Sequence, residues 1–151
     1  MTLADVRRKP VVSMSDGLKI GDVDDLVVDI SRWAIPEFHL AAKGIHGLLP
    51  LVKIKGIGPD AVTIETADAV DWTGKASGRL FSEIKELTVV DGTGTILGHL
   101  TDLKFDLDGA IESLEVQRGG VLGIGAHVNI VKPAEIRGVG DRLITVDITP
   151  A

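Results

Sequence analysis

The sequence contains no cysteine, which excludes disulfide bonds, thiolate metal sites and cysteine nucleophiles. Aromatic residues are scarce, with two tryptophans, three phenylalanines and no tyrosine, so there is little material for the stacking platforms that bind single-stranded nucleic acid. The net charge of −6 also argues against non-specific nucleic-acid binding, which depends on cations that neutralise phosphates. No stretch approaches the roughly 20 apolar residues of a membrane-spanning helix, and no apolar segment follows the charged N-terminus as in a signal peptide. We therefore expect no membrane insertion and a cytoplasmic location.

What the sequence does contain is one stretch in two copies. Residues 17–30 read GLKIGDVDDLVVDI, and residues 94–107 read GTILGHLTDLKFDL. Equivalent positions are separated by 77 residues (94 − 17). The identical pairs are Gly17 with Gly94, Gly21 with Gly98, Asp25 with Asp102, Leu26 with Leu103, and Asp29 with Asp106. The duplication predicts two modules, and because a domain of about 60 residues buries only ~60% of its extended-chain surface, each module gains stability by packing on the other.

Later segments are repeated as well. Residues 54–58 (IKGIG) match residues 136–140 (IRGVG) at an offset of 82 residues (136 − 54). The second module therefore carries five additional residues (82 − 77), which we assign to the glycine-rich loop 118–125. We predict a first module at residues 1–70, a linker at 71–84 and a second module at 85–151.

Both copies share one irregularity in their apolar pattern. From Leu26 onward the apolar residues alternate as in a half-buried strand. The step from Val23 to Leu26 is one residue too long for this alternation, and the second copy repeats that step. One extra residue in a strand is a β-bulge, which bends the strand as a small closed sheet requires. We expect Asp25 and Asp102 to accept backbone N–H groups that the bulge leaves unpaired.

The remaining segments are short and separated by turn residues. Residues 11–14, 61–65 and 143–148 have the composition of strands, and residues 106–109 (DLDG) that of a hairpin turn. Residues 31–42 favour a strand that starts after Pro36, with a short helical turn as the alternative. Residues 79–87 fit either a short helix or an entry strand. Since no helical period is sustained anywhere, we predict an all-β fold.

These motifs together resemble the PRC-barrel family. The shared features are a curved strand that begins Gly-x-apolar and carries two aspartates, a hairpin, a turn marked by proline, and a closing Ile-x-Gly-Ile-Gly strand. The family includes the cytoplasmic part of the photosynthetic reaction-centre H subunit and the C-terminal domain of the bacterial ribosome maturation factor. The likeness covers roughly residues 11–65 and 87–147. It implies two tandem, small, six-stranded PRC-type β-barrels packed against each other, a role in binding macromolecules, and no shared catalytic residues. The second copy departs from the first where Lys132-Pro133 replaces Leu49-Pro50.

Polar groups that catalyse reactions or bind metals do not have the spacing that such sites require. The carboxylates of residues 22–29 run directly into a strand and cannot wrap one calcium ion, and a hairpin turn accounts for the acidic residues 106–112. The glycine runs at 92–94 and 119–125 match no nucleotide-binding loop, and no serine has a nucleophile elbow around it. The histidines, which lack zinc-site spacing, are His39, His46, His99 and His127. We predict no catalytic residue, no bound metal and no cofactor.

One segment suits a binding role. Residues 33–40 (WAIPEFHL) concentrate large side chains, and aromatic residues are enriched at the centres of protein interfaces. Our candidate partner contacts are Trp33, Phe38, His39 and Trp72. The alternative is that Trp33 and Phe38 fill the core of the first module and that Trp72 seals the joint between the modules.

The sequence thus favours a non-enzymatic adaptor that mediates protein–protein interaction, or self-association as a homodimer, with a partner that it does not identify. A factor that binds RNA or the ribosome during RNA processing or ribosome maturation is the second hypothesis, based on the likeness to the maturation factor. The cations available for that role are Arg7, Arg8, Lys9, Lys43, Lys53 and Lys55. The third hypothesis is an enzyme or a small-ligand binder. It is the least favoured, because barrels of this size are filled by their own side chains and leave no roomy pocket.

Overall fold

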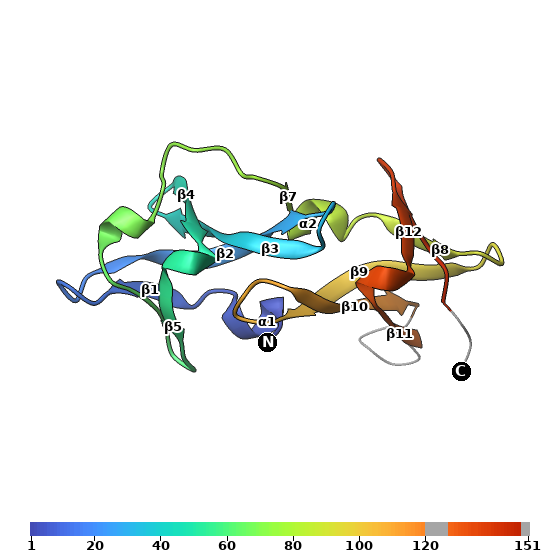
Figure 1. The fold of residues 1–151 in the computed structure, drawn as a ribbon, viewed down its shortest axis with the longest axis horizontal. Coiled ribbons are helices and arrows are strands. Elements are labelled where there is room, and N and C mark those ends of the chain that lie inside the picture. Colours follow the sequence, from blue (N-terminus) through green and yellow to red (C-terminus); the bar gives the residue numbers. More distant parts are fainter. Residues whose placement is uncertain (120–126, 149–151) are drawn as a thin grey trace.

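The computed structural model describes residues 1–119 and 127–148, which form two β-sheets lying end to end (Figure 1). The first half of the chain contains α1 (Leu3–Val6), β1 (Pro10–Ser13), β2 (Lys19–Asp29), β3 (Ala34–Ala42), β4 (Ile45–Pro50), η1 (Leu51–Lys53), β5 (Ile54–Ile57), β6 (Val62–Ile64) and η2 (Ala67–Ala69). The second half contains β7 (Arg79–Leu80), α2 (Phe81–Ile84), β8 (Thr88–Asp91), β9 (Ile96–Phe105), β10 (Ile111–Arg118), β11 (His127–Val131), η3 (Pro133–Glu135), β12 (Ile136–Val139) and β13 (Leu143–Val146). The all-β prediction is confirmed.

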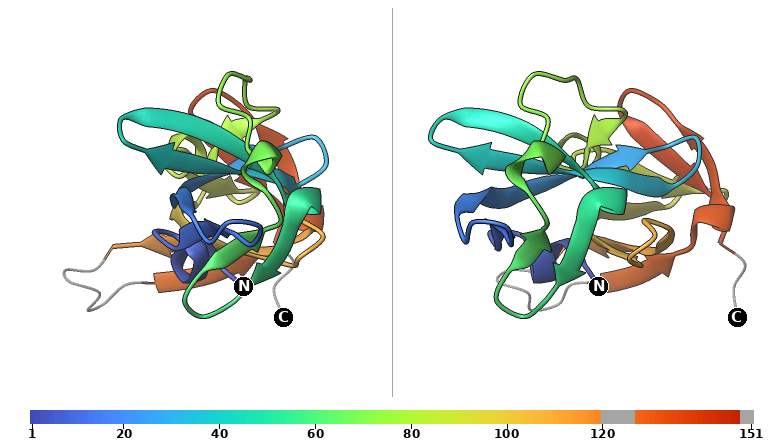
Figure 2. Two further views of the ribbon diagram at one scale, coloured as in Figure 1. Left: turned by 90° about the vertical axis from the view of Figure 1, so that its left-hand side faces the viewer. Right: turned by 60° about the vertical axis from the view of Figure 1, so that its left-hand side comes forward.

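The two sheets have the same strand order. The first runs β4-β3-β2-β1-β6-β5, with β7 paired to β2, and the second runs β11-β10-β9-β8-β13-β12. In each sheet one pair is parallel, β1 with β6 and β8 with β13. Among the described residues no ladder joins the two ends of either path, and the β3–β4 and β5–β6 hairpins point away from each other (Figure 2). The predicted closure into barrels is therefore not confirmed.

The predicted bulges occur at equivalent places. Between β2 and β3 the register passes from Val23 to Asp25 and skips Asp24. Between β9 and β10 the partners pass from Leu100 to Asp102 and skip one residue. The same bulge thus bends the longest strand of both sheets, as the shared slip in the apolar pattern predicts.

Close approach of strands explains why Gly21 and Gly98 recur. A Cβ atom at Gly21 would lie 2.9 Å from the carbonyl oxygen of Ala41, and one at Gly98 would lie 1.9 Å from that of Gln117. The two glycines differ in backbone conformation, since Gly98 has a φ of +124° and Gly21 does not have a positive φ. Position in the sheet is conserved between the copies, and the local dihedral angle is not.

Two segments whose secondary structure the sequence left open are residues 31–42 and 79–87. Residues 31–42 contain strand β3, as favoured, although it begins before Pro36. Both readings of residues 79–87 are correct in part, because strand β7 leads directly into α2. The register of β10 with β11 places the additional residues of the second half between Arg118 and His127. The loop proposed for them, 118–125, lies almost entirely outside the described residues.

The two halves exchange their N-terminal segments. Thr2, just before α1, forms an antiparallel bridge with Lys104 of β9 in the second sheet. Leu80, just before α2, pairs with Val27 of β2 in the first sheet. These pairs are equivalent, because Lys104 is the counterpart of Val27 at the 77-residue offset (104 − 27). Each half therefore places its short helix on the sheet of the other half, near the middle of the molecule (Figure 1).

The halves also share one core. Buried apolar side chains from both sheets form a single cluster, in which Phe38 and Phe105 pack edge to face with ring centroids 6.0 Å apart. Ala34, the first residue of β3, and Ala110, just before β10, form an isolated bridge between the halves. The predicted packing of one module on the other is present. The module bounds stay a prediction, and residues 79–84 of the predicted linker form β7 and α2.

Candidate functional site

The repeated aspartates stabilise the bulges, as predicted. The Asp25 carboxylate is 3% exposed and accepts the N–H of Leu26 (2.8 Å) and that of Ser82 in α2 (3.2 Å). Asp102 accepts the N–H of Leu103 (2.7 Å) and that of Leu3 in α1 (2.9 Å). Each carboxylate thus joins a bulge to the helix that the other half contributes, which is a structural role.

The four predicted contact residues lie in different environments. Phe38 is completely buried against Phe105, so its prediction as a partner contact is wrong and the alternative of a core residue is right. Trp33 is half-buried at the turn before β3, where its carbonyl accepts the N–H of Ile111. Trp72 packs on β4, since a Cβ atom at Gly47 would lie 2.7 Å from its ring.

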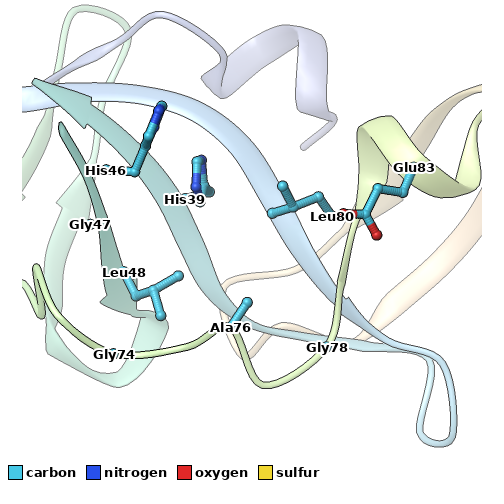
Figure 3. Close-up of a pocket in the computed structure, with 9 residues that line it drawn as sticks. All are labelled: His39, His46, Gly47, Leu48, Gly74, Ala76, Gly78, Leu80 and Glu83. Carbon is cyan, nitrogen blue, oxygen red and sulfur yellow. The ribbon is translucent and has the colours of Figure 1, made fainter. Parts of the chain in front are cut away.

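The outer face of the first sheet is covered by residues 70–80. Asp71 and Leu48 of β4 exchange backbone hydrogen bonds of 2.8 and 2.9 Å, and the Glu37 carboxylate of β3 accepts the N–H and the hydroxyl of Ser77 at 2.9 Å. Beneath this segment lies a cavity of about 200 Å³ (Figure 3). The cavity is lined by His39, His46, Gly47, Leu48, Gly74, Ala76, Gly78, Leu80 and Glu83.

Two residues of the cavity wall, His39 and His46, lie close to Asp24, which is not itself part of the wall. His39 Nδ1 lies 3.1 Å from Asp24 Oδ2, and the rings of His39 and His46 stack with centroids 4.9 Å apart. One ligand atom from each of the three side chains lies within 4.8 Å of the others. The sequence did not predict this cluster, because its three residues lack the short spacings along the chain that mark zinc sites. The signal was the hairpin, in which His39 pairs with Leu48 and His46 is the diagonal neighbour on the same face.

The equivalent face of the second sheet has different chemistry. Glu115 takes the place of His39, and Thr101, the bulged residue, donates its hydroxyl hydrogen to the Glu115 carboxylate at 2.8 Å. Ile130 pairs with Glu115 as Leu48 pairs with His39. Leu48 is 6% exposed, whereas Ile130 is 56% exposed. The outer face is therefore covered in the first half and open at Ile130 in the second.

Some cations of the RNA hypothesis have partners within the protein. Arg7 Nε donates to the carbonyl oxygen of Asp24 (3.3 Å), and Lys9 Nζ donates to that of Gly58 (2.7 Å). Lys55 forms an ion pair with Glu65 at 3.1 Å. In the part of the chain that the structure describes, no helix is long and apolar enough to cross a membrane.

Comparison with known proteins identifies the family of part of the chain. The family model of the PRC-barrel domain matches residues 78–151, which contain β7 to β13, the second bulge and Asp102. No curated protein matches the chain. The matched segment covers the second of two halves with the same strand order. Through residues 78–151, the chain belongs to the PRC-barrel domain family.

Proposed function

We propose that this protein is a non-enzymatic adaptor of two tandem PRC-type modules, which binds a protein partner through the open outer face of its second sheet. A PRC-barrel domain suggests a binding or adaptor role. The tandem assignment is supported by the first half, which repeats the strand order, the bulge and the bulge carboxylate of the half that the family model matches. The cytoplasmic location stays a prediction.

The difference between Leu48 and Ile130 carries the proposal. These residues occupy equivalent positions, yet one is 6% and the other 56% exposed. Val128, two residues before Ile130 on the same strand, is 53% exposed. Strand β11 ends the sheet path and reads HVNIV, without the lysine or proline that commonly protects an edge strand. An apolar edge of this kind gains free energy when a partner covers it.

The first half shows what kind of segment covers such an edge. Asp71 pairs with Leu48 in an antiparallel bridge, and the preceding residue, Val70, is buried at 7% exposure. Val70 lies against Gly47, the neighbour of Leu48 in β4. We infer that the partner contributes an extended segment that pairs with β11 and covers the side chain of Ile130. Strand addition of this type takes affinity from backbone hydrogen bonds and specificity from alternate side chains.

The test compares Ile130→Asp with a matched control, Val52→Asp. Val52 is 92% exposed and lies in η1 of the other half. The tagged full-length protein is used to capture partners with and without RNase, and the captured protein is then purified and titrated. Because burial of an isoleucine contributes roughly 1.5–3 kcal/mol, we expect Ile130→Asp to weaken binding about 10- to 100-fold, with Val52→Asp unchanged.

Three outcomes contradict this proposal in different ways. If Ile130→Asp and Val52→Asp bind the partner with equal affinity, the partner does not bind at β11. Loss of the association with RNase favours the RNA hypothesis. A purified protein that is dimeric by light scattering and becomes monomeric with Ile130→Asp shows that the face binds a second copy and not another protein.

A further inference from the structure

We propose that Asp24, His39 and His46 bind a divalent transition-metal ion, with Zn²⁺ the best match, at the end of the covered cavity in the first half. This site is independent of the partner surface proposed above, which lies in the second half. Its failure would leave the adaptor proposal intact.

The donor set favours zinc. Two imidazoles and one carboxylate are the ligands of many zinc sites, and with three protein ligands the fourth position is left to water or an exogenous group. Imidazole donors suit zinc and neighbouring transition metals, while magnesium and calcium prefer oxygen ligands alone. The donors are therefore wrong for the calcium site that the acidic residues 22–29 first suggest.

The geometry brings the donors close to the separation that a metal requires. With metal–ligand bonds of about 2.0–2.1 Å, neighbouring ligands in a tetrahedral site are about 3.4 Å apart. His39 Nδ1 and Asp24 Oδ2 are already 3.1 Å apart, so a metal ion replaces the hydrogen between them. All three ligand atoms lie within 4.8 Å of each other, and rotation of exposed side chains closes the rest. His46 is exposed and the Asp24 side chain is 47% exposed, whereas the His39 side chain is 15% exposed.

The sheet holds the three ligands in place. The bulge inserts Asp24 into β2 just before Asp25, the residue that pairs with His39, and the hairpin sets His46 diagonally across from His39. Arg7 holds the backbone carbonyl of Asp24, which leaves the carboxylate available. Because the three strands belong to one sheet, the ligands are arranged before the metal binds.

The cavity supplies room for the fourth ligand. Figure 3 shows His39 and His46 next to each other at one end, and Glu83 at the far end beyond Leu80. The wall also includes small residues, Gly47, Gly74 and Ala76. A metal ion bound by His39 and His46 would border this space of about 200 Å³, which is large enough for water or a small anion.

The second half provides a natural comparison. It has the same bulge and hairpin, but Thr101 and Glu115 occupy the positions of Asp24 and His39, and Val128 occupies that of His46. One carboxylate and no imidazole remain there. The fold forms in both halves, so the histidines of the first half are not needed to build the sheet.

The experiment is a calorimetric titration of the tag-free, chelator-treated full-length protein with Zn²⁺, followed by Co²⁺ absorption spectroscopy. We expect one equivalent of Zn²⁺ per chain and a Co²⁺ spectrum of a four-coordinate site. His46→Ala and Asp24→Asn change exposed side chains, and each should weaken binding by about 100-fold or more, at least as much as the loss of an outer-shell partner of a metal site. His127→Ala, an exposed histidine of β11, is the control and should bind as the wild type does.

Two results would overturn the site. One is a wild-type affinity no tighter than that of the double variant Asp24→Asn/His46→Ala. The other is loss of binding in His127→Ala, which would place the metal on the second half. Circular dichroism of each variant, expected to match the wild type, excludes unfolding as the cause of lost binding.

Discussion

At the scale of single residues, two aspartates connect local and tertiary structure. A bulge leaves N–H groups without a ladder partner, and a short carboxylate beside it is placed to accept them. The repeat of Asp25 and Asp102 was enough to predict this. The sequence pattern did not reveal that the second oxygen of each carboxylate accepts an N–H of a helix from the other half, because that contact spans 57 and 98 residues of chain.

Replacement of Asp25 by alanine should destabilise the protein. The change leaves two N–H groups, of Leu26 and Ser82, without their acceptor in a site that is 3% exposed. We expect the free energy of unfolding to fall by about 2–4 kcal/mol, with a smaller loss for Asp25→Asn, which keeps one acceptor oxygen. Urea unfolding monitored by circular dichroism measures this.

The control for that measurement is Asp60→Ala, which removes an exposed carboxylate and should change stability by less than about 0.5 kcal/mol. If Asp25→Ala and Asp60→Ala unfold at the same urea concentration, the carboxylate at the bulge has no structural role.

At the scale of elements, the turns explain why the strands could be located from the sequence. The carboxylate of Asp91, the last residue of β8, accepts hydrogen bonds from the Thr93 hydroxyl (2.6 Å), the Thr93 N–H (2.9 Å) and the Thr95 N–H (3.1 Å). Such bonds are made within a few residues, so the local sequence specifies them. They lower the pKa of Asp91 below its ordinary value of 3.8, the Thr93 hydroxyl being the largest cause.

This turn should contribute to acid sensitivity. Because the pKa of Asp91 is lower in the folded protein than in the unfolded chain, the unfolded chain binds the proton first as the pH falls. The contribution to stability is therefore present above the ordinary pKa of 3.8 and is lost as the pH falls below it. We expect Asp91→Asn to lose less stability than the wild type between about pH 5 and about pH 3 in urea unfolding.

The comparison variant is Asp16→Asn, in the equivalent turn of the first half. The Asp16 carboxylate accepts the N–H of Leu18 and no threonine hydroxyl among the described residues. An Asp91→Asn variant with the same loss of stability between the two pH values as the wild type would show that this turn does not contribute to acid sensitivity.

At the scale of the whole molecule, the exchange of α1 and α2 makes two repeats into one folding unit. Each sheet requires a segment from the other half, and the core is a single cluster. A module of about 60 residues would bury only ~60% of its extended-chain surface and would be marginally stable by itself. The shared core and the reciprocal contacts together favour unfolding in one cooperative step.

Ile144→Ala tests this cooperativity. Ile144 is buried in β13 of the second half, whereas Trp33 lies in the first half and Trp72, in the linker, packs on β4 of the first half. Loss of this side chain should destabilise the protein by about 2–5 kcal/mol. If the halves unfold together, tryptophan fluorescence and far-ultraviolet circular dichroism shift to lower urea by the same amount. A fluorescence midpoint that stays at the wild-type value would show that the first half unfolds independently.

The sequence by itself determined what depends on near neighbours: the all-β class, the paired bulges, the turns and the role of Asp25 and Asp102. Alternation, turn residues and an extra residue in a strand act within a few positions of chain, so their signal survives in one dimension. Only the tertiary structure decided that Phe38 is a core residue and that the sheets are not closed. It also decided that each half packs its short helix on the sheet of the other half, and that Asp24 lies beside two histidines. Each of these depends on register and on contacts between residues far apart in the chain, which a linear pattern does not encode.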